Sequence, residues 1–205
     1  TPSTDEPLRE YLLKTIQSVT QRDILTVIFL TFITFSLLFG TMATFLPILA
    51  DMRFHASSAT IGFVFSIASL GTLTGTIWIS RNLSRLSPYY LLLTGYSLFT
   101  IALITIPWIP FLPLLLLPVF LWGLGQGLNG PILNTIMLNY APPQNRGGLL
   151  AVQGTTIRLA QTIGPSLFSL IFATSTLNWV YGIAACFTCM MLALVIYRIP
   201  KGKLS

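Results

Sequence analysis

This sequence has few charged residues. Asp, Glu, Lys and Arg together make up 8% of its 205 residues, and only five of them are acidic. Soluble globular domains carry roughly a quarter of their residues as charges, whereas the mean hydropathy here is +0.80. A water-soluble globule would have too little polar surface to cover itself, so that class is excluded.

Histidine and cysteine are nearly absent as well. His55 is the only histidine, and Cys186 and Cys189 are the only cysteines. One histidine without a second cluster of ligands predicts no metal site, and no cofactor is expected. The two thiols lie in an apolar run without a strand or Gly-Pro turn beside them, so we interpret them as apolar packing and not as a redox pair. An intramembrane serine protease would need a histidine base at membrane depth, so no catalytic residue is predicted.

Long apolar runs are what the sequence has instead. About 20 apolar residues suffice to cross a hydrocarbon core roughly 30 Å thick. The runs are continuous and do not alternate with polar residues, which predicts helices and not a barrel. We therefore predict an all-α membrane protein, a six-transmembrane-helix bundle, with a linker at 1–22, a membrane domain at 23–200 and a tail at 201–205. The predicted spans are residues 24–50, 58–80, 89–109, 111–138, 147–175 and 177–198.

Basic residues fall on alternate connections between these runs. Lys and Arg are retained on the cytoplasmic side of short loops, so the pattern predicts a protein of the plasma (inner) membrane with both termini in the cytoplasm. The net charge of +6 is thus interpreted as a topology signal, and no nucleic-acid partner is expected. Arg53 stands alone on the outer side, while the inner side carries Arg9, Lys14, Arg22, Arg81, Arg85, Arg146, Arg198, Lys201 and Lys203.

The linker differs from the rest of the chain because it mixes both signs of charge. Leu8, Leu12, Ile16 and Val19 recur at helical spacing, which predicts a short helix lying along the cytoplasmic membrane surface. A disordered linker is the alternative. The chain begins with Thr1 instead of Met, so we expect this residue to lie inside a longer protein.

Arg158 is the exceptional charge at membrane depth. Counting from Arg146 at the cytoplasmic edge, it lies roughly 18 Å into the membrane. An arginine there costs at least about 2.5 kcal/mol, so it should face the bundle interior or a water-filled cavity, together with Gln161. Alternatively, it caps backbone carbonyls or pairs with an anion to lock the assembly. No Asp, Glu or His occupies the middle of a span, so any proton-coupling group must lie on another segment.

Glycine and proline concentrate in the fourth run. Gly123 and Gly127 are four residues apart, a spacing that lets a second helix backbone approach closely. Pro131 is expected to weaken or kink this helix. The fifth run also contains a glycine and a proline, Gly164 and Pro165. The proline leaves one backbone carbonyl without its helical donor and permits a bend.

Two amide side chains fall within the same glycine run. Gln126 and Asn129 lie three residues apart on one helix face, so they either meet a substrate or satisfy neighbouring helices. Residues 125–130 also fit the spacing G-x-G-x-x-G. They lie within an apolar run and do not follow a strand of a βαβ unit, so no nucleotide site is predicted.

Three segments of the sequence resemble the carboxy-terminal half of a major facilitator superfamily transporter. They are the glycine run 123–131, the connection 141–147 and residues 154–165. The likeness is closest to bacterial efflux-type members, in which an R-L-G-Q-T-x-G-P-like stretch opens the eleventh helix. Ala160 stands here where a glycine is common, and the connection at 80–85 keeps the basic residues of the family's cytoplasmic motif but lacks its Asp and second Gly.

The resemblance implies that the six runs are helices seven to twelve of a twelve-helix carrier. The amino-terminal six-helix half would come from the same chain or from a second chain. The implied function is secondary active transport of a small organic molecule, with proton-coupled efflux by alternating access as the preferred interpretation. Sugar or metabolite uptake by the same architecture and a six-span receptor that transports nothing are the alternatives.

The candidate site residues follow from these patterns together. Small hydroxyls, amides and aromatic rings suit a neutral or weakly amphipathic solute. The predicted substrate cavity consists of Arg158, Gln161, Gln126, Asn129, Asn134, Thr34 and Phe35. The predicted gating and hinge residues are Gly127, Gly130, Pro131, Gly164, Pro165, Arg81 and Arg85.

Overall fold

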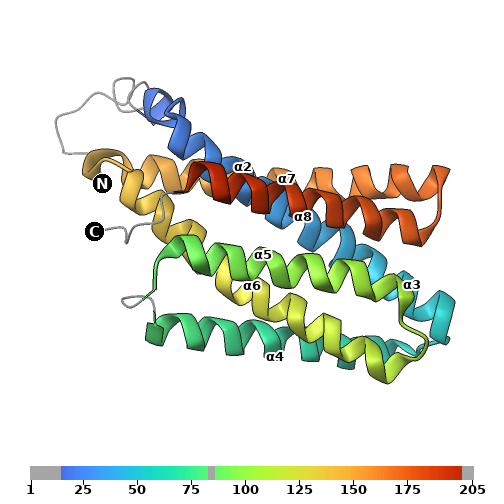
Figure 1. Ribbon diagram of the computed structural model, residues 1–205. Coiled ribbons are helices and arrows are strands. Elements are labelled where there is room, and N and C mark those ends of the chain that lie inside the picture. Colours follow the sequence, from blue (N-terminus) through green and yellow to red (C-terminus); the bar gives the residue numbers. More distant parts are fainter. Residues whose placement is uncertain (1–14, 83–85, 200–205) are drawn as a thin grey trace.

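The computed structural model describes residues 15–82 and 86–199, and the secondary structure of this part of the chain is entirely helical. The helices lie side by side in an elongated bundle (Figure 1). This confirms the predicted all-α membrane fold. The elements are α2 (Arg22–Leu37), η1 (Leu38–Ala43), α3 (Thr44–Phe54), α4 (Ser58–Asn82), α5 (Pro88–Thr105), η2 (Ile106–Trp108), α6 (Leu112–Tyr140), η3 (Pro143–Asn145), α7 (Arg146–Thr174) and α8 (Leu177–Arg198).

Each predicted span corresponds to one of these helical segments, with ends that differ by a few residues. Within the described residues, five helices are long and apolar enough to cross a membrane, and α2, η1 and α3 count as one of them, Arg22–Phe54. Among the long helices of the described residues, α7 lies outside this group, and it is 29 residues long. Its length suffices to cross, but Gln153, Arg158 and Gln161 lower its apolar character.

The two ends of the membrane domain lie at the same end of the bundle. Figure 1 shows that α2 begins where α8 ends, as an even number of crossings requires. Residues 15–19 are helical and precede a turn before Arg22, so they cover the last part of the predicted surface helix. Leu8 and Leu12, the first two positions of that helix, lie outside the described residues.

The first span contains a π-helix that the sequence analysis did not predict. Residues 24–50 were expected to form one continuous helix, but η1 interrupts the α-helical ladder between α2 and α3. The Thr44 hydroxyl donates a 2.8 Å hydrogen bond to the Phe39 carbonyl, five residues earlier. Pro47 follows within α3 and has no N–H to donate to the Ala43 carbonyl. Single-turn π segments of this kind occur frequently at functional sites.

Glycines bring α4 and α6 into direct backbone contact. A Cβ atom added at Gly123 would lie 2.1 Å from the Ala68 carbonyl oxygen, and one added at Gly127 would lie 2.2 Å from the Thr72 carbonyl oxygen. Opposite them, Gly71 and Gly75 of α4 face α6 backbone in the same way. The predicted close approach at Gly123 and Gly127 is confirmed. We call this contact, formed by Gly71, Gly75, Gly123 and Gly127, the α4–α6 seam.

Pro131 changes the hydrogen bonding within the same seam. A proline has no N–H, so the carbonyl of Gly127, four residues earlier, loses its helical donor. The hydroxyl of Thr76 on α4 donates a 3.3 Å hydrogen bond to that carbonyl. α6 runs as a single helix through Pro131, and α7 does so through Pro165. The bending role of these prolines stays a prediction.

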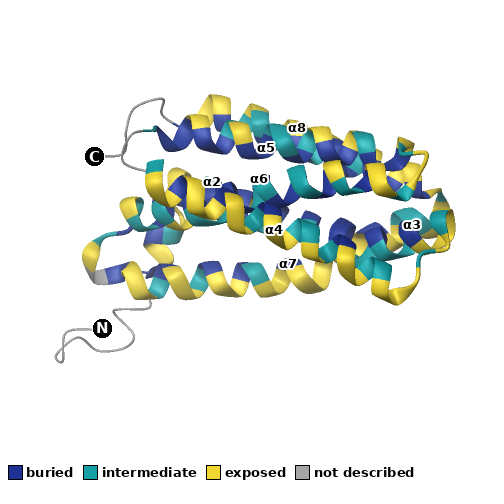
Figure 2. Cartoon of the chain, turned by 90° about the horizontal axis from the view of Figure 1, so that it is seen from below, coloured by how far each residue is buried: buried dark blue, intermediate teal, exposed yellow. Residues whose placement is uncertain are grey.

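Burial divides the helices into inner and outer ones. In Figure 2, buried residues concentrate on the sides that α2, α5, α6 and α8 turn toward one another, whereas α4 and α7 carry long exposed faces. Hydroxyl pairs join the inner helices: Thr34 and Tyr96 share a 3.1 Å hydrogen bond, and Thr100 donates to Thr188 over 2.8 Å. The free thiols of Cys186 and Cys189 lie on the exposed face of α8, and their role as apolar packing stays a prediction.

Candidate functional site

A cavity of about 320 Å³ lies between the first span, α4 and α6. The π-helix η1 supplies much of one wall, so its irregular backbone borders the cavity directly. We call this space the central cavity. It is lined by Leu38, Phe39, Met42, Ala43, Leu46, Phe65, Ala68, Ser69, Thr72, Trp122 and Gln126.

Two α6 residues in the lining, Trp122 and Gln126, each carry a buried polar atom without a partner among the described residues. The indole Nε1 of Trp122 and the amide Oε1 of Gln126 are both buried and form no hydrogen bond with any described residue. The two hydroxyls in the lining are already used as donors, because Ser69 and Thr72 donate to carbonyls of their own helix at 3.0 and 3.1 Å. Both atoms are enclosed by the protein, as are the unpartnered polar atoms of Ser36, Asn129, Asn145, Gln153 and Tyr181.

The sequence-predicted cavity residues separate in the structure. Gln126 lines the central cavity. Asn129 is fully buried against α5, where a Cβ added at Gly95 would lie 2.1 Å from its Oδ1 atom. Thr34 is buried and bonded to Tyr96, which joins α2 to α5. The structure therefore places Asn129 and Thr34 in helix contacts beside the cavity and not in its lining.

The other predicted cavity residues face outward to different degrees. Phe35 is half-buried and Asn134 is exposed. Arg158 and Gln161 are exposed on α7, on the side opposite the residues that α7 buries against the first span. Neither residue lines the central cavity. The exposed polar face of α7 consists of Gly154, Thr155, Arg158, Gln161, Thr162 and Ser166.

The predicted hinge glycines do not share one environment. Gly127 is part of the α4–α6 seam, and a Cβ added at Gly164 would lie 2.7 Å from the Ser36 carbonyl oxygen of α2. A Cβ added at Gly130 would meet nothing within 4 Å. Arg81 is exposed at the end of α4, and Arg85 lies outside the described residues. The gating role of all these positions stays a prediction.

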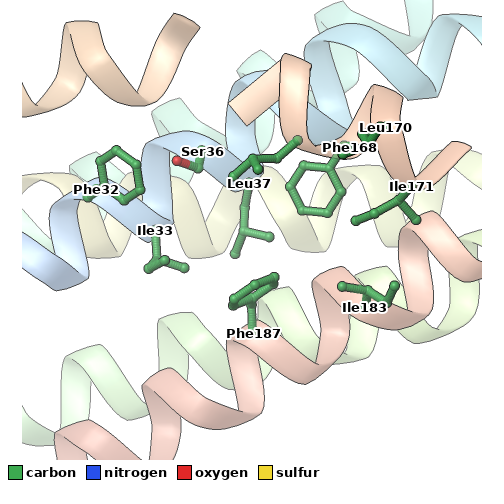
Figure 3. Close-up of a pocket in the computed structure, with 10 residues that line it drawn as sticks. Phe32, Ile33, Ser36, Leu37, Phe168, Leu170, Ile171, Ile183 and Phe187 are labelled. Carbon is green, nitrogen blue, oxygen red and sulfur yellow. The ribbon is translucent and has the colours of Figure 1, made fainter. Parts of the chain in front are cut away.

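A second cavity, of about 220 Å³, lies between α2, α7 and α8 (Figure 3). We call it the lateral cavity. Ser36 supplies its single polar side chain, and its buried hydroxyl oxygen has no partner among the described residues. Phe168 and Phe187 face each other across the space in Figure 3. The lining comprises Phe32, Ile33, Ser36, Leu37, Leu167, Phe168, Leu170, Ile171, Ile183 and Phe187.

Sequence analysis missed Trp122 as a site residue. Trp122 precedes Gln126 by four residues, so helical spacing places both side chains on one face of the fourth run. That signal was present in the sequence. The lateral cavity left no comparable signal, because its lining consists of apolar residues that are ordinary in any membrane helix.

A bundle of membrane-length helices that encloses polar groups in this way defines a multi-pass helical membrane protein. The family model of the Major Facilitator Superfamily matches residues 11–205, and the chain belongs to that family.

Individual relatives align with most of this chain. The MFS-type transporter YcnB of Bacillus subtilis is 29% identical over 142 residues, which cover 67% of this chain and 29% of YcnB. The MFS-type transporter YhhS of Salmonella enteritidis is 25% identical over 168 residues, covering 80% of this chain and 39% of YhhS. Mouse major facilitator superfamily domain-containing protein 10 is 26% identical over 153 residues, 74% of this chain and 32% of that protein. The chain thus spans about a third of the length of these relatives.

Proposed function

We propose that this protein transports small organic molecules across the membrane and that the substrate binds in the central cavity. The observation that carries the proposal is the cavity itself, whose mainly apolar lining includes the amide side chain of Gln126 and the hydroxyls of Ser69 and Thr72. Pockets that combine apolar walls with a few placed polar groups are typical small-molecule sites. The names of YcnB and YhhS as MFS-type transporters support the same function.

The lining favours an uncharged, amphipathic substrate. Phe39, Phe65 and Trp122 provide aromatic walls, and the lining contains no charged side chain. A charged solute would lose its hydration there without gaining an opposite charge. The substrate class we propose is therefore the neutral organic molecule with an apolar body and one or two hydrogen-bonding groups.

We further propose that α7 packs against a second six-helix half, with this chain as the carboxy-terminal half of the carrier. Arg158 and Gln161 lie on the exposed polar face of α7, and an arginine facing lipid at that depth is unfavourable by at least about 2.5 kcal/mol. A partner surface or a water-filled space between two halves would remove that cost. Both termini would then lie in the cytoplasm of a plasma-membrane protein, as the basic residues indicate.

The partner half can be tested on the native gene product. Its upstream coding sequence and its mass in mild detergent together identify the partner. Six further spans upstream, or a dimeric mass for a chain that starts near Thr1, would support the proposal in cis or in trans. A six-span protein that is monomeric in the membrane would contradict it.

We propose export, coupled to protons, as the direction of transport. Asp23 and Asp51, the two acidic residues within the described helices, lie in the first turn of α2 and near the end of α3. The titrating group required for proton coupling would therefore belong to the partner half. Efflux-type resemblance supports export.

An uncharged dye tests transport and its direction. Cells that produce the native protein are loaded with Nile red, and its exit is followed by fluorescence with and without a protonophore. We expect faster exit than in cells lacking the protein, loss of the difference with protonophore, and about tenfold slower exit for Gln126→Met at equal membrane abundance. Trp108→Phe, a change of a 75% exposed residue that does not line the cavity, is the control. Exit equal to that of cells lacking the protein would overturn the proposal, and faster entry would favour uptake.

A further inference from the structure

An open groove of about 490 Å³ lies between the beginning of α2 and the end of α8. We call it the basic groove, and it is lined by Arg22, Leu25, Thr26, Phe29, Leu194 and Arg198. We infer that the basic groove binds one anionic phospholipid, with Arg22 and Arg198 on its phosphate and the apolar residues on its acyl chains. The inference goes beyond the proposed function, because lipid binding here requires neither transport nor the central cavity.

The basic groove is charged at the helix ends and apolar toward the middle of the bundle. Arg22 is the first residue of α2 and Arg198 is the last residue of α8, and Figure 1 shows these two helix ends at the same end of the bundle. Leu25 and Phe29 follow Arg22 by three and seven residues, so they lie on the same face of α2. Phe29 is therefore roughly 10 Å deeper along the helix axis. A phospholipid has the same order of parts, with a charged head group above apolar chains.

The two guanidinium groups have no protein partner among the described residues. Neither Arg22 nor Arg198 forms an ion pair or a side-chain hydrogen bond with any of them. The Thr26 hydroxyl is already used as a donor, over 2.8 Å to the Arg22 carbonyl. Two like charges that line one groove repel each other, and an anion between them removes the repulsion. Arginine suits a phosphate in particular, because its planar group can donate two parallel hydrogen bonds to phosphate oxygens.

The start of α2 adds a second reason for an anion at this place. The N-terminus of a helix is the positive end of its dipole, where a cation is unfavourable and an anion is favourable. Arg22 stands at that end, and Gln21 provides no side-chain hydrogen bond to cap it. Asp23 lies in the same first turn, but it does not line the basic groove. A lipid phosphate in the groove would compensate both the arginine and the helix dipole.

A lipid can reach the basic groove from the membrane. Both arginines are exposed, and Leu25 and Phe29 are 46% and 41% exposed. The polar face of α7, which we propose to meet the partner half, contributes no residue to this groove. In the proposed topology this end of the bundle is cytoplasmic, and the anionic lipids of the cytoplasmic leaflet attract basic residues.

Two phospholipids that differ in net charge test the groove on the purified native protein in mild detergent. Phosphatidylglycerol is anionic, whereas phosphatidylcholine with the same acyl chains is neutral overall. Native mass spectrometry of separate titrations counts the lipids bound per protein and gives the Kd of the first one. One arginine near the membrane surface is worth about a factor of five, so we expect phosphatidylglycerol to bind about 25-fold more tightly.

The variants assign this preference to the two arginines. Arg22→Gln and Arg198→Gln should each weaken phosphatidylglycerol about fivefold and leave phosphatidylcholine unchanged, and the double variant should show no preference. Arg198→Lys keeps the charge and should keep most of the preference. Arg146→Gln removes an exposed arginine at the start of α7, outside the groove, and is the matched control that should change neither affinity. All variants should unfold at the wild-type temperature in phosphatidylcholine alone.

Four outcomes would overturn the inference. Equal affinity for the two lipids, or a preference that persists in the double variant, would remove the site. An equal loss in Arg146→Gln would reduce the preference to general attraction by basic residues. Displacement of phosphatidylglycerol by soluble glycerophosphate at the same concentration would identify a free phosphate compound as the ligand. Lower thermal stability of Arg22→Gln or Arg198→Gln in phosphatidylcholine alone would show that the chain itself holds these side chains.

Discussion

Two helix contacts of the bundle are built differently. In the α4–α6 seam, glycines from both helices meet backbone atoms of the other helix, with added Cβ atoms at 2.1 to 2.6 Å from carbonyl oxygens. In the contact between the first span and α7, which we call the α2–α7 seam, Gly164 faces the Ser36 backbone but Gly40 faces the ring of Phe168 at 2.3 Å. One seam is backbone against backbone on both sides, and the other includes a side chain that can move.

The difference separates a fixed wall of the cavity from an adjustable one. Backbone atoms of two long helices cannot yield locally, so α4 and α6 should move as one body. Phe168 borders the lateral cavity, so its ring has space to move into, and Gly40 lies within the π-helix η1. We therefore expect the first span to shift against α7 while the α4–α6 pair stays intact during transport.

The largest expected effect comes from breaking the α4–α6 seam. In Gly123→Ala the new methyl group would lie 2.1 Å from the Ala68 carbonyl oxygen, with only backbone to move aside. We expect a loss of stability of about 3 kcal/mol, the upper range for overpacking, visible in thermal unfolding of the detergent-solubilised protein. Gly62→Ala on α4 meets nothing within 4 Å and serves as the control. Unfolding of Gly123→Ala at the wild-type temperature would show that the seam is not rigid.

A smaller effect is expected in the α2–α7 seam, with a sharper distinction between its two glycines. In Gly164→Ala the new methyl group presses on the Ser36 backbone, so the free energy of unfolding should fall by about 2 kcal/mol. In Gly40→Ala the methyl group meets mainly the Phe168 ring, so the fall should be about 1 kcal/mol. Adding Phe168→Leu should restore the stability of Gly40→Ala and leave that of Gly164→Ala unimproved. Thermal unfolding of the wild type, the three single variants and the two double variants gives the two double-mutant cycles. Equal rescue of both glycine variants would contradict the comparison.

Sequence patterns were sufficient for the features that depend on one helix at a time. Apolar length located the spans to within a few residues, and the spacing of Gly123 and Gly127 identified a face that approaches a neighbouring backbone. Residue type and spacing also placed Gln126 among the cavity candidates, and it is the predicted cavity residue that lines the central cavity.

Features that depend on which neighbour a face meets could not be predicted in this way. Asn129 shares a face with Gln126, yet it packs against Gly95 of α5, and nothing in the spacing distinguishes the two neighbours. The π-helix η1 had no signal beyond Gly40 and Pro47, which many regular membrane helices also contain. Arg158 stands out in the sequence as a charge within an apolar run, but its exposure on α7 could only come from the arrangement of the helices.

The smallest expected effect sharpens the account of the α4–α6 seam. Thr76→Val removes the 3.3 Å hydrogen bond to the Gly127 carbonyl, and interhelical hydrogen bonds in membranes average about 0.6 kcal/mol. Pro131→Ala would supply an N–H to the same carbonyl from within α6. Thr76→Val should therefore lower the free energy of unfolding by less in the Pro131→Ala protein than in the wild type. Thr74→Val is the control, since the Thr74 hydroxyl donates to the Leu70 carbonyl of its own helix. Thermal unfolding of the cycle would then show a positive coupling between Thr76 and Pro131. Additive effects would mean that the Gly127 carbonyl gains nothing from α4, and the seam would be held by glycine packing alone.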